Sequence, residues 1–263
     1  MIWFAYLALG AVAGLMAGLF GVGGGAIMVP VLALLYTALA LPAAHLMHLA
    51  LGTSMAAIVF TSLASLRAHA ARNAVLWPTV RSIAPGIVLG TFLGALLAGQ
   101  MSTRPLAWFF AAFMSYVALQ LLLDLKPHPA RTLPGRAGLA AVGLGIGAVS
   151  ALAAIGGGTM SVPFLTWCNV PLRVAIGTSA AIGFPIALAG SLGYLVAGQG
   201  ATGLPAGSFG YIYLPALALL VPASMLTAPI GARLAHRLPV RLLKKLFAAL
   251  ILLLLAKMLH GLP

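Results

Sequence analysis

Long apolar stretches, separated by short polar or glycine-rich stretches, recur along the whole chain. An α-helix needs about 20 apolar residues to cross the hydrocarbon core of a membrane, and most of these stretches approach that length. The pattern therefore predicts an all-α polytopic membrane protein. The apolar segments are expected at residues 2–20, 26–41, 46–66, 82–99 and 105–123, and at residues 138–155, 159–170, 174–197, 211–231 and 242–260.

Three matches that occur in the same order indicate an internal duplication. The matched pairs are GGGAIMVPVL at 23–32 with GGGTMSVPFL at 156–165, LGTS at 51–54 with IGTS at 176–179, and positions between Pro85 and Arg104 with positions between Pro222 and Arg241. Chance similarity between apolar helices is common, but three ordered matches that include a glycine triplet are not. The duplication predicts two transmembrane repeats of about five segments each, at residues 1–125 and 138–263, joined by a linker at 126–137.

The segment at 159–170 is too short to cross a bilayer as a helix. It follows a glycine triplet, as does its counterpart at 26–41, and consecutive glycines are unfavourable within a helix. We therefore expect the first two segments of each repeat to form a hairpin of helices broken at the glycines. Whether these segments are re-entrant or full spans stays open.

Basic residues are distributed oppositely in the equivalent loops of the two repeats. The loop after the third segment carries Arg67, Arg72 and Arg81, whereas its counterpart at 198–210 carries none, and the bias reverses in the loops after the fourth segment. Because basic loops face the cytoplasm, the repeats are predicted to have inverted topology, with the linker inside and both chain ends outside. Many secondary transporters are built this way, with the substrate site at the bilayer midplane between the repeats.

The composition restricts the function further. Only 6% of the residues are charged and 63% are hydrophobic, whereas soluble domains carry roughly 25% charged residues. The net charge of +13 comes from residues in short loops, so we expect no nucleic-acid partner. One cysteine, Cys168, and one acid, Asp124, leave no obvious metal-ligand set and no paired carboxylates. We therefore predict no enzyme, no metal site and no cofactor, and the scarcity of acids also argues against cation transport.

The two glycine triplets are the leading candidates for a substrate site. A helix that starts just after a break in the membrane directs free N–H groups and the positive end of its dipole into a cavity, which suits an anion. The alternative is that the glycines only allow close helix packing. The candidate residues are Gly23, Gly24, Gly25, Gly156, Gly157 and Gly158.

Hydroxyl side chains close to these helix starts are further candidates for binding an anion. Hydroxyl groups in helices also bond backwards to backbone carbonyls, which is the structural alternative. The first repeat has Ala26 and Met28 where the second has two of the hydroxyls, so the site is expected to be asymmetric. The candidates are Thr53, Ser54, Thr159, Ser161, Thr178 and Ser179.

Cationic or titratable side chains stand beside the Gly-Thr-Ser elements. His45 and His48 precede the first element, and Arg173 aligns with His48 in the second repeat. Such groups could attract an anion to an entrance or, for the histidines, take up a coupled proton. The alternatives are a structural role at the membrane interface for the histidines and a cytoplasmic anchor for Arg173.

In these motifs the sequence resembles the TauE/SafE family of membrane proteins, known as sulfite exporters. The resemblance rests on LFGVGGG at 19–25 with Pro30, AIGGG at 154–158 with Pro163, and the two Gly-Thr-Ser elements, and it covers essentially the whole chain. It implies a multi-pass permease of the bacterial inner membrane. It also implies a substrate among sulfite, sulfoacetate and other sulfur-containing organic anions.

The expected function is secondary transport of a small sulfur-containing anion, such as sulfite or an organosulfonate, by alternating access. Export is favoured because a negative cell interior drives an anion outward without a coupled ion. A channel-like anion pore and a non-transporting membrane accessory protein are the alternatives. The expected partners are the anion and the lipid bilayer, and the sequence leaves the oligomeric state open, a homodimer included.

Overall fold

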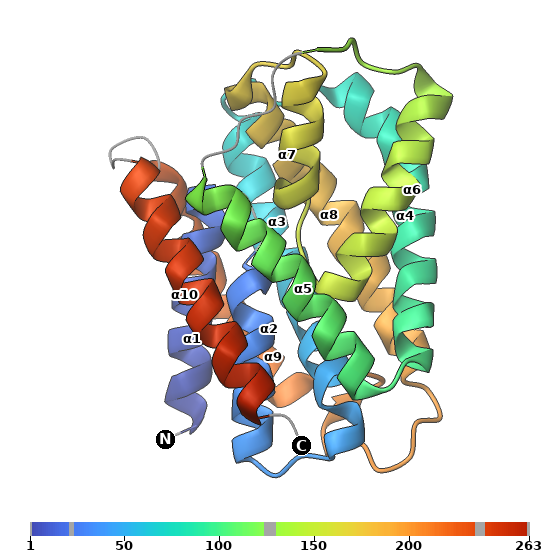
Figure 1. Ribbon diagram of the computed structural model, residues 1–263, viewed down its shortest axis with the longest axis vertical. Coiled ribbons are helices and arrows are strands. Elements are labelled where there is room, and N and C mark those ends of the chain that lie inside the picture. Colours follow the sequence, from blue (N-terminus) through green and yellow to red (C-terminus); the bar gives the residue numbers. More distant parts are fainter. Residues whose placement is uncertain (1, 21–23, 124–129, 235–239, 262–263) are drawn as a thin grey trace.

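The computed structural model describes residues 2–20, 24–123, 130–234 and 240–261, which are almost entirely helical (Figure 1). The helices are α1 (Ile2–Phe20), α2 (Gly25–Ala38), α3 (Leu46–Ala70), α4 (Trp77–Gln100), α5 (Thr103–Leu122), α6 (Arg136–Ala153), α7 (Gly158–Trp167), α8 (Leu172–Ala197), α9 (Leu214–Leu234) and α10 (Val240–Gly261). A 3₁₀ turn, η1 (Ala43–His45), precedes α3, and an antiparallel hairpin of β1 (Ser208–Phe209) and β2 (Ile212–Tyr213) precedes α9.

Seven helices of the described chain are long and apolar enough to span a membrane, namely α1, α3 with η1, α4, α5, α6, α8 and α9. The prediction of an all-α membrane protein is confirmed. With 14 and 10 residues, α2 and α7 are shorter than a span. Each follows a helix break at a glycine triplet, because α1 ends at Phe20 and α6 ends at Ala153. Two hairpins of broken helices, α1–α2 and α6–α7, were expected there.

Helices α3 and α8 form the centre of the bundle. In an apolar stretch of 18 residues, 67% of α3 and 61% of α8 is buried inside the bundle, compared with 28–44% for the other five spans. A helix shielded from lipid can carry polar side chains, which are costly on a lipid-facing surface. The two Gly-Thr-Ser elements therefore lie on the two helices best protected from the bilayer.

Glycines bring the outer helices into close contact with one another. A β-carbon at Gly86 or Gly90 of α4 would overlap the carbonyl oxygen of Ala140 or Leu144 in α6. In the same way, Gly14 of α1 packs on the backbone of α9. Close approach of this kind is how helices associate in a membrane, where no hydrophobic effect drives them together.

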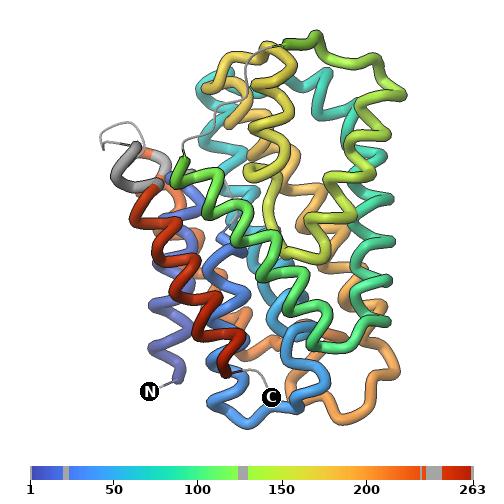
Figure 2. The backbone as a smooth tube through the Cα atoms, viewed as in Figure 1, coloured from blue at the N-terminus to red at the C-terminus, as the bar shows by residue number. Residues whose placement is uncertain are grey.

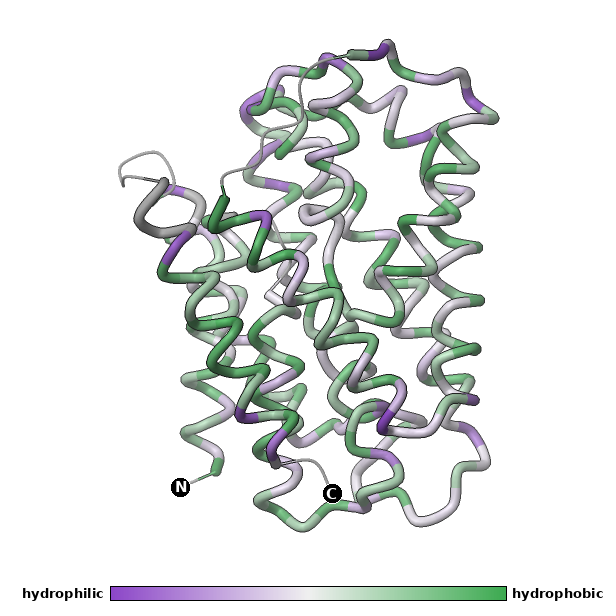
Figure 3. The backbone as a smooth tube through the Cα atoms, viewed as in Figure 1, coloured by the Kyte–Doolittle hydropathy of each residue, from purple (hydrophilic) through white to green (hydrophobic). Residues whose placement is uncertain are grey.

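The two ends of the bundle differ in charge. Helix α1 begins and α10 ends at one end, whereas α3 ends and α4, α6 and α8 begin at the other (Figures 1 and 2). The second end carries more of the hydrophilic positions (Figure 3), and we call it the arginine-rich end. Its described arginines are Arg67, Arg72, Arg81, Arg131, Arg136 and Arg173.

Several predicted boundaries are wrong. Helix α4 begins at Trp77 rather than at residue 82, and α3 ends at Ala70 rather than at residue 66. Residues 211–213 were expected at the start of an apolar segment, but they belong to the β-hairpin, and α9 begins at Leu214. Gly207 and Gly210 have positive φ angles of 85° and 55°, a backbone conformation that glycine adopts without strain. The hairpin is held by the Tyr211 amide, which donates to the Tyr194 carbonyl at 3.2 Å.

Candidate functional site

The breaks of the two hairpins lie side by side in the interior of the bundle. A β-carbon at Gly25, the first residue of α2, would overlap the carbonyl oxygen of Ala154, which caps the end of α6. It would also lie 3.1 Å from Cδ1 of Ile58 in α3. Helix α2 then runs toward the chain termini, whereas α7 runs toward the arginine-rich end (Figure 1). The start of α2 is thus a neighbour of the end of α6, where the second break begins.

Each short helix starts with free backbone amides. Gly24 caps α2 in the left-handed conformation, at φ 82°, and its carbonyl accepts from the amides of Ile27 and Met28 at 3.1 and 3.0 Å. In α7 the Gly157 carbonyl accepts from the Ser161 amide at 2.9 Å. The backbone amides between each capping glycine and these first donors have no acceptor within the helix. They form the positive end of the helix dipole. The predicted candidate Gly23 lies outside the described residues.

The second break is packed on α8. A β-carbon at Gly157 would lie 2.6 Å from the Ser179 carbonyl oxygen and 3.2 Å from the Gly183 amide. Gly156 and Gly158 are buried beside it, and Thr159 is half-buried. The backbone of this break therefore lies directly against the second Gly-Thr-Ser element.

Several buried hydroxyl groups on α3, α7 and α8 have no hydrogen-bond partner among the described residues. They belong to Ser54, Ser161 and Ser179, which are completely buried, and to Ser65, which is 8% exposed. Eight other helical hydroxyls in the described part of the chain bond backwards, as Ser191 does to the Ala187 carbonyl at 2.7 Å. An unsatisfied buried hydroxyl costs about 1–3 kcal/mol, so such groups mark positions where a water or ligand would be stabilising.

The threonines of the two Gly-Thr-Ser elements hold loops. Thr53 Oγ1 accepts a hydrogen bond from the Tyr213 amide at 2.9 Å, and Thr178 Oγ1 accepts one from the Leu76 amide at 3.0 Å. The preceding glycines pack on the same loops, Gly52 on the Tyr211 carbonyl and Gly177 on the Ala74 carbonyl. Each element in one half of the chain thus anchors the loop that follows the central helix of the other half.

The three entrance candidates lie in different environments. His48 is 2% exposed, and its Nε2 lies 3.1 and 3.0 Å from the carbonyl oxygens of Ala98 and Met101. Its ring packs on Tyr211 at a centroid distance of 4.8 Å. His45 is half-buried, with Nε2 3.2 Å from the Thr202 carbonyl oxygen. These contacts give both histidines a structural role next to the β-hairpin, whereas Arg173 is exposed at the arginine-rich end.

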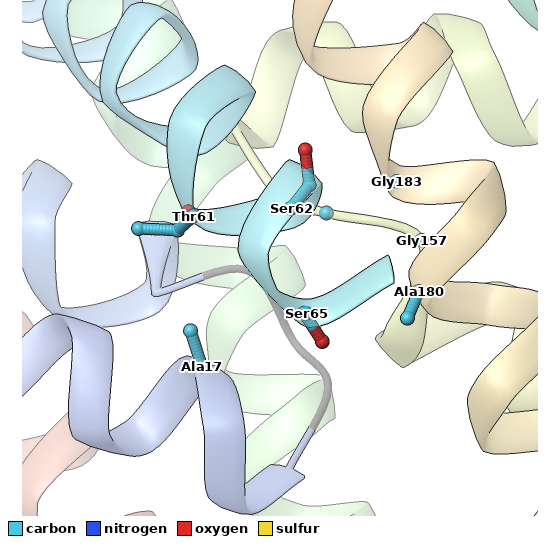
Figure 4. A pocket seen from close by; sticks show the side chains of 8 residues that line it. Ala17, Thr61, Ser62, Ser65, Gly157, Ala180 and Gly183 are labelled. Atoms are coloured by element: carbon cyan, nitrogen blue, oxygen red, sulfur yellow. The ribbon is translucent and has the colours of Figure 1, made fainter. Parts of the chain in front are cut away.

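Sequence reasoning missed a polar cleft beside the second break (Figure 4). Its hydroxyls come from Thr61, Ser62 and Ser65 of α3, and its other walls include Gly157 and Gly183. The cavity volume is about 10 Å³, which is room for about one water molecule. These hydroxyls follow Ser54 by seven, eight and eleven residues, which places them on one face of α3, so helical periodicity could have revealed them.

Among the described residues, no group of three histidine, cysteine or acidic side chains could hold a metal ion. A bundle of membrane-spanning helices with two internal helix breaks defines a multi-pass membrane protein. The chain belongs to the TauE/SafE family. The family model, described as "Sulfite exporter TauE/SafE", matches residues 6–258.

Relatives that match most of the chain are named as transporters. A "Probable membrane transporter protein" of Haemophilus influenzae is 39% identical over 92% of both chains. YunE of Bacillus subtilis, with the same description, is 30% identical over 73% of this chain and 77% of its own. MJ0441 of Methanocaldococcus jannaschii is 23% identical over 92% of this chain and 90% of its own. No solved structure matches this chain. The protein is therefore a membrane transporter, and in a bacterium its membrane is the inner membrane.

Proposed function

We propose that this protein is a secondary carrier that exports a small sulfur-containing anion, such as sulfite or an organosulfonate. The observation that carries the proposal is the set of unpartnered buried hydroxyls of Ser54, Ser161 and Ser179, of which Ser161 lies in the first turn of α7 and Ser179 lies beside Gly157. Hydroxyls and backbone amides supply hydrogen-bond donors, and the helix dipoles favour negative charge. The family description adds the sulfur chemistry.

In this proposal the amides after Gly24 and Gly157 and the hydroxyls of Ser54, Ser161 and Ser179 bind the anion. Thr159, at the start of α7, is a further donor. Thr53 and Thr178 contribute through the loops that they anchor, because their oxygens already accept backbone hydrogen bonds.

We further propose that the two halves are inverted repeats that exchange access by rocking against each other. Two observations support this arrangement. Helices α2 and α7 run in opposite directions from neighbouring breaks (Figure 1), and the Gly-Thr elements make equivalent contacts with each other's loops. Alternating access in such transporters takes place around a fixed central site.

A carrier is favoured over an open pore because the cleft beside the second break is nearly closed. Its volume of about 10 Å³ admits about one water molecule, so an anion passes only after a conformational change. The cleft extends along α3 toward the arginine-rich end, and the residues that align with Thr61, Ser62 and Ser65 in α8 are Ile186, Ala187 and Gly190. This one-sided polar lining suits loading from the arginine-rich end, which the positive-inside rule assigns to the cytoplasm.

The test is counterflow in proteoliposomes. Vesicles loaded with unlabelled sulfite are diluted into labelled sulfite, and sulfoacetate, thiosulfate, sulfate and taurine are then tried as competitors. A carrier accumulates label transiently and saturates, whereas a pore only equilibrates it. Flux no greater than that of protein-free vesicles for every anion would refute the proposal.

A further inference from the structure

A groove between the first turns of α4 and α6 has the chemistry of an anion site and lies away from the helix breaks. It has a volume of about 660 Å³ and is lined by Pro78, Arg81, Ser82 and Pro85 of α4 and by Arg136, Ala137 and Ala140 of α6. Both arginines are exposed at the arginine-rich end. Ser82 donates its hydroxyl hydrogen to the Pro78 carbonyl at 2.9 Å, so the two guanidinium groups supply the side-chain donors of the groove.

The positive charge of the groove is not balanced by the protein. The chain has one acidic side chain, Asp124, which lies outside the described residues, and one carboxylate cannot neutralise two guanidinium groups. Neither α4 nor α6 has a side-chain hydrogen bond at its N-cap, Leu76 or Gly135. Two helix dipoles therefore add positive potential at the same place.

Below the arginines the groove continues onto an apolar surface. Leu89 and Leu93 follow Pro85 along the same face of α4 and are each 51% exposed, and Leu144 of α6 is 43% exposed. Trp77, at the start of α4, is 44% exposed, which is typical of a side chain at the depth of the lipid headgroups. A free anion would use only the upper part of this surface, whereas a phospholipid matches both parts.

We propose that this groove binds an anionic phospholipid. Its headgroup phosphate lies between Arg81 and Arg136, and its acyl chains lie over Leu89, Leu93 and Leu144. Basic pockets between membrane helices recognise lipid headgroups in this way. The glycine-mediated crossing of α4 and α6 just below the arginines keeps the two sides of the groove together.

The test is native mass spectrometry of delipidated protein titrated with dioleoylphosphatidylglycerol or dioleoylphosphatidylcholine. We expect the Arg81→Gln/Arg136→Gln variant to bind phosphatidylglycerol about 30-fold more weakly than the wild type. The Arg81→Lys/Arg136→Lys variant keeps both charges and should retain most of the affinity. The control, Arg67→Gln/Arg233→Gln, removes the same charge from exposed positions outside the groove and should bind as the wild type does.

Three results would overturn the proposal. The first is an equal loss of affinity in both glutamine variants, which indicates unspecific attraction. The second is equal affinity of the wild type for both lipids. The third is displacement of bound phosphatidylglycerol by glycerol phosphate at similar concentration, which indicates a site for a soluble anion.

Discussion

Gly25 lies against the carbonyl oxygen of Ala154, so the helix break in one half of the chain contacts the helix break in the other. The two residues are far apart in the sequence, and a side chain at Gly25 would separate the breaks. This contact places the free amides of α2 next to the end of α6, where the second break begins, and the proposed anion site depends on it.

Substitution of Gly25 tests this contact. In Gly25→Ala, the β-carbon meets backbone that cannot move away easily, and we expect a loss of about 1–3 kcal/mol in stability together with a loss of anion binding. In the matched change Gly145→Ala, the β-carbon enters open space, with no atom within 4 Å. Thermal unfolding in detergent should leave Gly145→Ala unchanged and lower the Tm of Gly25→Ala. Equal Tm values would show that the breaks are not tightly packed.

The threonine anchors predict paired effects in the two halves. Thr53→Val and Thr178→Val keep the shape of the side chain but leave the amide of Tyr213 or Leu76 without its acceptor. Each change should cost about 1–3 kcal/mol, because an unpaired backbone amide is left in a partly buried position. Thr53→Ser and Thr178→Ser keep the acceptor and should cost less. Valine variants as stable as the serine variants would contradict the anchoring role.

The cleft predicts one-sided access to Ser65. In a Cys168→Ser chain, Ser65→Cys should react with a membrane-impermeant methanethiosulfonate from the arginine-rich side, and more slowly when sulfoacetate is present. The control is Ser191→Cys, a buried position on α8 whose hydroxyl is satisfied; it should label more slowly from either side. Labelling of Ser65→Cys only from the side of the chain termini would reverse the proposed direction of loading.

The single native cysteine predicts a pH dependence. Burial raises the pKa of the Cys168 thiol, and the nearby Arg131 opposes this effect more weakly. The reactive thiolate fraction at neutral pH is therefore smaller than that of a free cysteine, whose pKa is about 8.5. The reaction of Cys168 with N-ethylmaleimide should therefore be slow at neutral pH. The control is Thr132→Cys, an exposed site in a Cys168→Ser chain, and the rate for Cys168 should rise at a more alkaline pH than the rate for this control. Identical pH profiles would contradict the shift.

The sequence predicted the features of the fold that depend on local composition. Three consecutive glycines followed by a proline end one helix and start another, and α2 begins one residue before the predicted segment at 26–41. The approximate positions of the helices followed from the apolar runs, although α4 begins five residues before the predicted segment. The β-hairpin at 208–213 was missed because the apolar Ile212 and the aromatic residues around it resemble the start of a membrane helix.

The partners of the predicted site residues could not be read from the sequence. Thr53 and Tyr213 are 160 positions apart, and only the packing of α3 on the hairpin brings them together. The carbonyls that hold His48 lie at the end of a different helix. Ser65 lies on the same face of α3 as Ser54, but its lack of a hydrogen-bond partner is visible only in the structure.

The most direct test of the proposed site is equilibrium binding of labelled sulfite to purified protein. We compare the wild type with Ser54→Ala and Ser179→Ala, whose buried hydroxyls have no partner among the described residues, and with Ser191→Ala, whose hydroxyl is already satisfied. A hydrogen bond to a charged group contributes about 1.5–3 kcal/mol, so each of the first two changes should weaken binding about tenfold or more, and Ser191→Ala should not. If the wild type binds sulfite and both site variants bind it with the same affinity, the result would contradict an anion site at the helix breaks.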